Sequence, residues 1–186
     1  MFRVRSSFAR GRSLGFAAIT GVFALALASP AAAAVNAYLF VDGINGPSTS
    51  REGAIDLLSF SVGVTNVQST TTRLGATGQG AGKPVCSDLS IMKVVDSASI
   101  PLLADALAGK VLPTVKIVYS KAVADTTFDY FTLTLGNVIV SSVQESGSNE
   151  NPTESVSFNA QTYTFTYTPQ KADGTAGTAI TAGGNC

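Results

Sequence analysis

The sequence contains no histidine and no tryptophan, and only 13% of its residues are charged. The absence of histidine excludes a serine–histidine–aspartate triad, a HExxH zinc site and proton transfer by an imidazole. The acidic residues are scattered, and no pair of them has a spacing that indicates a glycosidase-like dyad. The sequence therefore predicts no catalytic residue and no enzymatic activity.

Basic residues are also few, and a third of them stand near the N-terminus. Without residues 1–34, eight Lys and Arg remain against twelve Asp and Glu, and these basic residues stand singly along the chain. Binding of DNA or RNA depends on clustered positive charge. The composition therefore excludes a nucleic acid as the partner.

Motifs that hold phosphate or metal are missing as well. The glycine-rich run "GATGQGAGK" lacks the first glycine of a P-loop, because Thr77 stands there, and Pro84 replaces the Ser or Thr that would bind magnesium. Asp42-Gly43 is not followed by the further acidic ligands of a calcium loop. We predict no cofactor and no metal, and we interpret 67–84 as an exposed surface loop.

The N-terminus has the pattern of a secretory signal peptide. An apolar run from Phe16 to Ala28 follows a basic segment, and Ala32 and Ala34 satisfy the small-x-small rule for cleavage. We expect cleavage after Ala34, which makes residues 1–34 the signal and Val35 the first mature residue. The protein would then be periplasmic or secreted, with no membrane attachment; an uncleaved anchor helix is the alternative.

Strand patterns separated by turn residues dominate the rest of the chain. One pattern, 54–66, places Leu58, Phe60, Val62 and Val64 on one face, and another, 112–122, places Val115, Ile117 and Tyr119 inward. The range 126–146 is either one long strand or two strands bent at Gly136–Asn137. The remaining strands are predicted at 36–41, 86–96 and 156–168.

One segment departs from the strand pattern and predicts a helix. In 97–110, apolar residues recur at helical spacing on one face. Ser99 can cap the helix, Pro101 suits its first turn, and Gly109 is placed to end it. The predicted face consists of Ile100, Leu103, Ala104 and Leu107. A mainly β protein with a single flanking helix follows from this pattern.

The last strand pattern, "TYTFTYT", alternates threonine with aromatic residues. Just upstream, Val156, Phe158 and Ala160 have the opposite phase, so the apolar set changes face near Ala160–Gln161. Either a β-bulge lies there or the strand is covered on both faces. Cover on both faces points to a subunit interface, whose candidate contact residues are Tyr163, Phe165, Tyr167, Thr164 and Thr166.

Several runs together resemble the haemolysin-coregulated protein (Hcp) family, the tube protein of type VI secretion. "DGINGPSTSREGAIDLLSFSVG" is similar to the family's first loop and second strand, and "DLSIMKVVDSASIPLLADALAGKVLPTVKIVYSKA" to its strand–helix–strand centre. "DYFTLTLGNVIVSSVQESGS" resembles its paired strands, and "YTPQKADG" the end of its barrel. The resemblance covers roughly residues 37–174 and carries these motifs in the family's order.

The resemblance implies a β-barrel of two antiparallel sheets with one flanking α-helix, in a domain that spans residues 35–174. It also implies assembly into a hexameric ring that stacks into a hollow tube, with a secreted effector as cargo or a spike protein as partner. A tube subunit assembles in the cytoplasm, so the export signal departs from the family pattern.

Three hypotheses for the function follow, none of them enzymatic. The chain forms an Hcp-like ring outside the cytoplasm, or it is a tube component or effector carrier of type VI secretion, or it is a secreted monomeric β-barrel that serves as a binding or adhesin-type module. Counting subunits separates the first two hypotheses from the third. The mature N-terminus separates the first hypothesis from the second.

The sequence contains two cysteines, Cys86 and Cys186, and the second is its last residue. In an exported protein an even pair indicates a disulfide rather than a metal or redox site. We expect residues 175–186 to form a flexible tail, long enough for Cys186 to reach Cys86 of the same subunit. A bond between stacked rings and two free thiols are the alternatives.

Overall fold

The computed structural model of the protein describes residues 35–66, 84–123, 126–147 and 151–186. These residues form ten strands and one helix, and every strand pair is antiparallel. Eight strands make one sheet, in the order β2-β1-β7-β8-β9-β6-β3 with β10 also paired to β9. The eight are β1 (Val35–Val41), β2 (Ile55–Asp56), β3 (Ser59–Ser61), β6 (Leu89–Val94), β7 (Val111–Val123), β8 (Thr126–Ser146), β9 (Thr153–Tyr167) and β10 (Ile180–Asn185).

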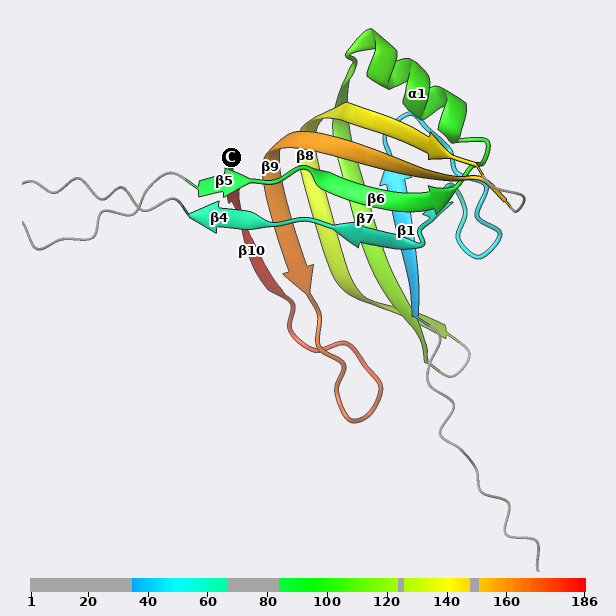
Figure 1. The fold of residues 1–186 in the computed structure, drawn as a ribbon. Helices are drawn as coiled ribbons and strands as arrows, with labels where there is room; N and C mark the ends of the chain where they lie inside the picture. Colours follow the sequence, from blue (N-terminus) through cyan, green and yellow to red (C-terminus); the bar gives the residue numbers. More distant parts are fainter. Residues whose placement is uncertain (1–34, 67–83, 124–125, 148–150) are drawn as a thin grey trace, which may run out of the picture. The chain divides into compact units, whose positions relative to one another are not determined.

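The large sheet curls into a half barrel, and β4 (Val64–Asn66) and β5 (Pro84–Cys86) form a small second sheet (Figure 1). The curl brings β3, at one end of the sheet, close to β7, which is separated from it by β8, β9 and β6 in the strand order, because the ring of Phe60 in β3 lies 5.5 Å from the ring of Tyr119 in β7. The core inside the curl includes Leu39, Ile117 and Phe158, which are fully buried. The predicted class, a mainly β barrel of two antiparallel sheets with one flanking helix, is confirmed, and the barrel takes the form of a half barrel plus a small second sheet.

The three longest strands bend at a common level. Strict alternation places inward side chains two residues apart, but at this level each strand spaces them three apart. The pleat is therefore interrupted in all three strands at once. Below this level the inward side chains stand at even positions of a strand and above it at odd positions, or the reverse. The inward residues on the two sides of this level are Leu112 and Val115 in β7, Leu135 and Val138 in β8, and Ala160 and Tyr163 in β9.

The bend also explains why the apolar set of β9 changes face. Asn137 in β8 has a left-handed φ of 52°, and a Cβ added to Gly136 would lie 2.5 Å from Thr162 Oγ1. The register shift between β8 and β9 lies between Val140 and Ser142. A bulge at Ala160–Gln161, one of the two alternatives from the sequence, is not found, because β8 and β9 keep one register from Gly136↔Thr162 to Val138↔Ala160. The range 126–146 is a single strand, β8.

The helix α1 (Ser99–Ala108) forms where the sequence predicts it, but it buries a different face. Leu102 is fully buried, whereas Ile100 is 68% and Leu107 82% exposed. Ser99 lies inside the helix and makes no cap hydrogen bond; the N-cap is Ala98. Gly109 ends the helix in the left-handed conformation, as predicted, and its N–H donates to Ala106 O at 3.2 Å.

The single strand predicted over 54–66 is wrong, because this segment changes its strand partner twice. It forms β2, β3 and β4, which pair with β1, β6 and β5 in turn. A chain that turns between partners cannot keep one face inward, so Leu58 is 60% and Val64 55% exposed. The inward positions predicted for β7 are confirmed, because Val115 and Ile117 are fully buried and Tyr119 packs against the core.

The flexible tail predicted over 175–186 is wrong for its second half. Residues 180–185 form β10, which pairs with β9 in the register Ile180↔Tyr167 to Asn185↔Thr162. Residues 168–179 connect the two strands through a turn in which the Gly174 N–H donates to Lys171 O at 2.9 Å. The surface loop predicted over 67–84 lies outside the described residues, except for Pro84, which begins β5.

Candidate functional site

The five residues predicted to contact a neighbouring subunit lie on the half of β9 beyond the bend. Tyr163 is buried in the domain's own core, and its hydroxyl donates to Ser87 O at 3.2 Å. Phe165 is partly buried against the same core. Thr164 is exposed, Thr166 is half-buried and Tyr167 is 50% exposed. The structure thus uses Tyr163 and Phe165 inside the subunit and leaves Thr164 and Tyr167 exposed, while the Thr166 hydroxyl shares a hydrogen bond with Thr181 of β10.

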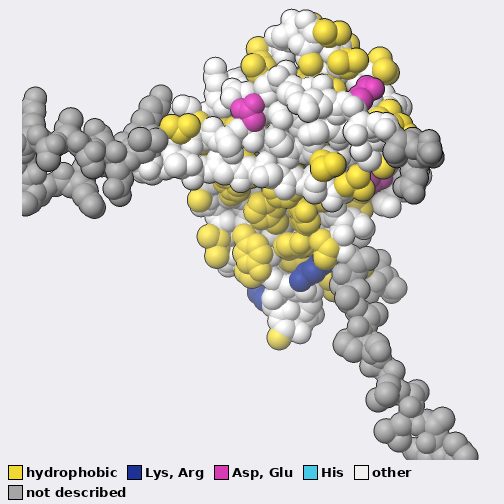
Figure 2. Space-filling model, in the orientation of Figure 1, with side chains coloured by type: hydrophobic (Ala, Val, Ile, Leu, Met, Phe, Trp, Pro, Cys, Tyr) yellow, Lys and Arg dark blue, Asp and Glu magenta, His cyan; other side chains and the backbone are white. Residues whose placement is uncertain are grey.

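An open aromatic hollow lies at the end of the half barrel. Its walls are five aromatic side chains from four strands, around a cavity of about 350 Å³: Phe60, Tyr119, Tyr130, Phe131 and Tyr167. The rings contact one another, with centroids 6.1 Å apart between Tyr119 and Tyr130 and 6.3 Å apart between Phe60 and Phe131. Figure 2 shows apolar side chains gathered over the lower halves of β7, β8 and β9. This hollow is an apolar surface that the subunit does not cover.

A bulge shapes the hollow. Tyr119 pairs with Phe131 and Ser120 with Asp129, so Tyr130 is the extra residue of β8. Bulges re-aim side chains, and here both Tyr130 and Phe131 contact the ring of Tyr119. Burial raises the pKa of Tyr130 above its ordinary value, with Tyr119 and Tyr167 nearby adding to the shift. The hydroxyl of Tyr130 therefore stays neutral at physiological pH.

The outer face of α1 is a second open apolar surface. Ile100 and Leu107 are exposed, and Leu103 lies half-buried between them. Three large apolar side chains on one exposed helical face are typical of a contact with another protein. This is the face that the sequence predicted to be buried in the domain.

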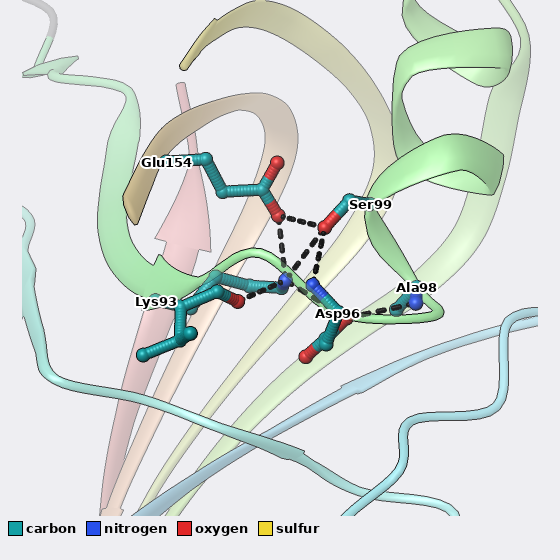
Figure 3. A network of polar contacts seen from close by, with 6 residues as sticks. Lys93, Asp96, Ala98, Ser99 and Glu154 are labelled. Atoms are coloured by element: carbon teal, nitrogen blue, oxygen red, sulfur yellow. Dashed lines mark hydrogen bonds and ion pairs between the residues drawn. The ribbon is translucent and has the colours of Figure 1, made fainter. Parts of the chain in front are cut away.

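The inner end of α1 is tied to the sheet by a buried polar cluster (Figure 3). Lys93 and Glu154 are both fully buried, and Lys93 Nζ lies 2.6 Å from Glu154 Oε1 and 2.9 Å from Asp96 Oδ1. The Ser99 hydroxyl donates to Glu154 Oε1 at 2.8 Å and accepts from the Asp96 N–H at 2.9 Å. Among the described residues, Glu154 Oε2 has no hydrogen-bond partner. The cluster positions the first turn of α1 against β6 and β9.

A second polar cluster holds the loop between β1 and β2. Both Nη atoms of Arg51 donate to the carboxylate of Asp129, at 2.6 and 2.7 Å, and Nη1 also donates to Ser120 Oγ at 3.0 Å. The guanidinium lies 5.7 Å from the ring centroids of both Tyr38 and Phe40. The hydrogen bond to Asp129 raises the pKa of Arg51, against the opposing effect of burial.

The two cysteines form an intrachain disulfide at the end of β10. The Cα atoms of Cys86 and Cys186 lie 5.7 Å apart. The disulfide borders an apolar pocket of about 300 Å³ between β10 and the small sheet, with Tyr163 and Phe165 among its lining residues. The bond therefore closes one side of a pocket whose floor belongs to β9.

Neither a metal centre nor a membrane-spanning helix is found in the described part of the chain. No group of three or more Cys, Asp or Glu side chains is arranged there to hold a metal ion. The described helix has ten residues, fewer than a bilayer crossing requires. The features of the described residues that are available to contact another molecule are the two open apolar surfaces and the disulfide-bordered pocket.

Sequence reasoning missed the aromatic hollow and the polar clusters. Phe60, Tyr119 and Phe131 each fit a strand pattern, but their strands lie far apart in the sequence. The one available signal was the pair Tyr130-Phe131, because two adjacent large aromatics cannot both face inward in a regular strand. That pair indicated the bulge.

Comparisons with known proteins agree on one family. The model of the family described as "Type VI secretion system effector, Hcp" matches residues 38–167. The relative "Protein hcp1" of Pseudomonas aeruginosa is 37% identical over 89 residues, which are 47% of this chain and 55% of the relative. This chain therefore spans about half the length of that relative.

Two solved structures share the fold over most of both chains. One is described as a type six secretion system protein; it is 29% identical, covers 82% of this chain and 96% of its own, and has a TM-score of 0.72. The other, Hcp1 from Salmonella typhimurium, is 27% identical, covers 82% and 95%, and has a TM-score of 0.65. With a family match over well more than half of its length and this half-barrel fold, the chain belongs to the Hcp family.

Proposed function

We propose that this protein is a non-enzymatic structural subunit that assembles with copies of itself into a closed ring, hexameric as the family resemblance implies. Such rings can stack into a tube, in type VI secretion or in an exported variant of it. The observation that carries the proposal is the pair of open apolar surfaces on one small subunit, the aromatic hollow and the outer face of α1. Apolar surface of this kind favours association, because contact removes it from water.

The predicted interface residues on β9 fit this proposal in part. Tyr167 lies in the aromatic hollow, and Thr164 and Thr166 provide an uncharged polar surface on the same strand. We propose these three as contacts or lumen-facing residues. Tyr163 and Phe165 support them from inside the subunit. A secreted effector in the lumen and a spike protein at the tube end are the further partners we propose.

Export is the second part of the proposal. Val35, the first residue after the predicted cleavage site, belongs to β1 and pairs with Lys121, so the mature chain would keep every described strand. We therefore propose that the folded domain acts in the periplasm or outside the cell. Intact mass of the protein from those fractions tests the cleavage. A full-length chain that stays in the cytosol would contradict export and favour a cytoplasmic tube.

Native mass spectrometry of the purified full chain at micromolar concentration tests the assembly. We expect a closed oligomer for the wild type, a shift towards monomer for Tyr167→Asp, and the same shift for Leu107→Asp on the helix face. Gln144→Glu places a charge on an exposed residue that belongs to neither surface and should leave the oligomer unchanged. A wild-type monomer across the range would overturn self-assembly and favour the secreted binding or adhesin-type module.

A further inference from the structure

Strand β10 is held on the domain by few interactions besides its backbone pairing. All six of its residues, Ile180–Asn185, are exposed, so the strand buries little apolar surface. Its side chains contribute one hydrogen bond between the hydroxyls of Thr166 and Thr181, at 3.1 Å. Strands held only by exposed backbone hydrogen bonds open easily. The disulfide that follows β10 therefore has a large share in keeping the strand in place.

The disulfide joins the end of β10 to the small second sheet. Cys86 ends β5, which pairs with β4, and Cys186 follows β10 directly. The Cys186 N–H also donates to Gln161 O at 3.1 Å, which continues the pairing of β10 with β9. Both cysteines are only partly buried, and both line the apolar pocket, so the disulfide is not enclosed in the core.

We propose that the Cys86–Cys186 disulfide is a redox latch, and that its reduction by a dithiol releases β10 from β9. A thiolate of the dithiol attacks one cysteine sulfur, which breaks the S–S bond and leaves a mixed disulfide and one free cysteine. The second thiol of the reagent then displaces the other cysteine. The products are two cysteine thiols and an oxidised dithiol.

Release of β10 changes the surface of the domain. The residues of β9 that pair with β10, Thr162–Tyr167, lose a strand partner along one edge. The wall of the pocket formed by Gly183, Gly184 and Cys186 moves away, which uncovers Tyr163 and Phe165. If the chain is exported as proposed, the latch is open in the reducing cytoplasm and closes in an oxidising compartment. The latch itself is a property of the purified protein and does not depend on export or on ring formation.

Hydrogen exchange of the full chain, oxidised and after treatment with dithiothreitol, tests the latch. For the oxidised protein we expect slow exchange in the C-terminal peptide that contains β10. After reduction, with two thiols counted per chain, we expect exchange of that peptide to be about tenfold faster or more. Peptides from β7 and β8 should exchange at an unchanged rate, and they provide the internal reference.

Two variants distinguish the effect of the disulfide on hydrogen exchange at β10 from the effect of the strand's other contacts. Cys186→Ser should exchange fast at β10 with and without dithiothreitol. Thr181→Ala loses the hydroxyl contact but keeps the disulfide, so it should stay within about twofold of the oxidised wild type. Slow exchange at β10 in Cys186→Ser, or a disulfide that resists dithiothreitol in the folded protein, would overturn the latch. Equal acceleration across β7 and β8 would also overturn it, because the disulfide would then stabilise the whole domain.

Discussion

Two polar clusters tie distant parts of this domain together, and they differ mainly in burial. In one, Lys93 and Glu154 have no exposed side-chain surface. In the other, the side chains of Arg51 and Asp129 are 31% and 38% exposed. A buried ion pair loses much hydration when it forms, so the loss of one partner leaves a costly charge, whereas an exposed pair is solvated in either case. An ion pair thus determines the local structure at the buried site, whereas a similar ion pair adds little stability at the exposed site.

The two clusters also differ in what they position. Lys93 and Glu154 hold Ser99, so they select which face of α1 packs on the sheet. The Arg51–Asp129 pair holds a loop whose last residue, Ala54, is already buried, as is Ile55 at the start of β2. We infer that the buried cluster specifies the position of the helix. The exposed pair reinforces a loop that packing already places.

Removal of the buried cation should have the largest effect on stability. We expect Lys93→Met to lower the free energy of unfolding by about 3–5 kcal/mol, because the Glu154 carboxylate stays buried without its cation. Urea unfolding at neutral pH measures the change. The double variant Lys93→Met/Glu154→Leu should recover most of the loss, since no buried charge remains. A loss below about 1 kcal/mol for the single variant would show that this cluster behaves like an exposed pair.

The contrast between buried and exposed positions can be sharpened within α1. We expect Leu102→Ala to lower the free energy of unfolding by about 2–4 kcal/mol, because it leaves a cavity beneath the helix. Leu107→Ala makes the same change on the exposed face and should stay within about 0.5 kcal/mol of the wild type. Urea unfolding of both variants at a concentration where the protein is monomeric gives the comparison. Equal losses would show that Leu107 is covered in solution.

Removal of the exposed carboxylate should have the smallest effect. We expect Asp129→Asn to lower the free energy of unfolding by at most about 1 kcal/mol, and by less at high salt, since the pair is partly solvated. Urea unfolding at low and high ionic strength measures the loss of unfolding free energy and its dependence on salt. A loss of several kcal/mol that salt does not change would mean that the pair is effectively buried.

The pH dependence of the same variant has a defined direction. The hydrogen bond from Arg51 lowers the pKa of Asp129 below its ordinary value of 3.8; burial opposes the shift, and Ser120 adds to it. A carboxylate with a lowered folded pKa stabilises the protein above its unfolded pKa, and this stabilisation is lost as the pH falls through the folded value. The difference between wild type and Asp129→Asn should therefore be constant down to about pH 5 and shrink below about pH 4. A difference that grows on acidification would contradict the assignment.

Local patterns predicted much of the fold because they depend on near neighbours in the chain. The inward positions Val115 and Ile117 follow from strand alternation, and Gly109 ends the helix because glycine adopts the left-handed conformation without strain. The motifs that resemble the Hcp family predicted a β-barrel with one flanking helix, and the family match agrees with them. The partner changes within 54–66 could not be predicted, because three short strands and one long strand have similar alternation.

The sequence by itself determined that this is a mainly β protein of the Hcp family, without histidine chemistry, and with two cysteines available to pair. The tertiary structure decided which face of α1 is buried. Ser99 is a core residue because its hydroxyl forms hydrogen bonds with Lys93 of β6 and Glu154 of β9. It also decided that β10 pairs with β9, and that the disulfide closes within one chain. Each of these depends on contacts between residues far apart in the chain, and periodicity carries information only about residues close together.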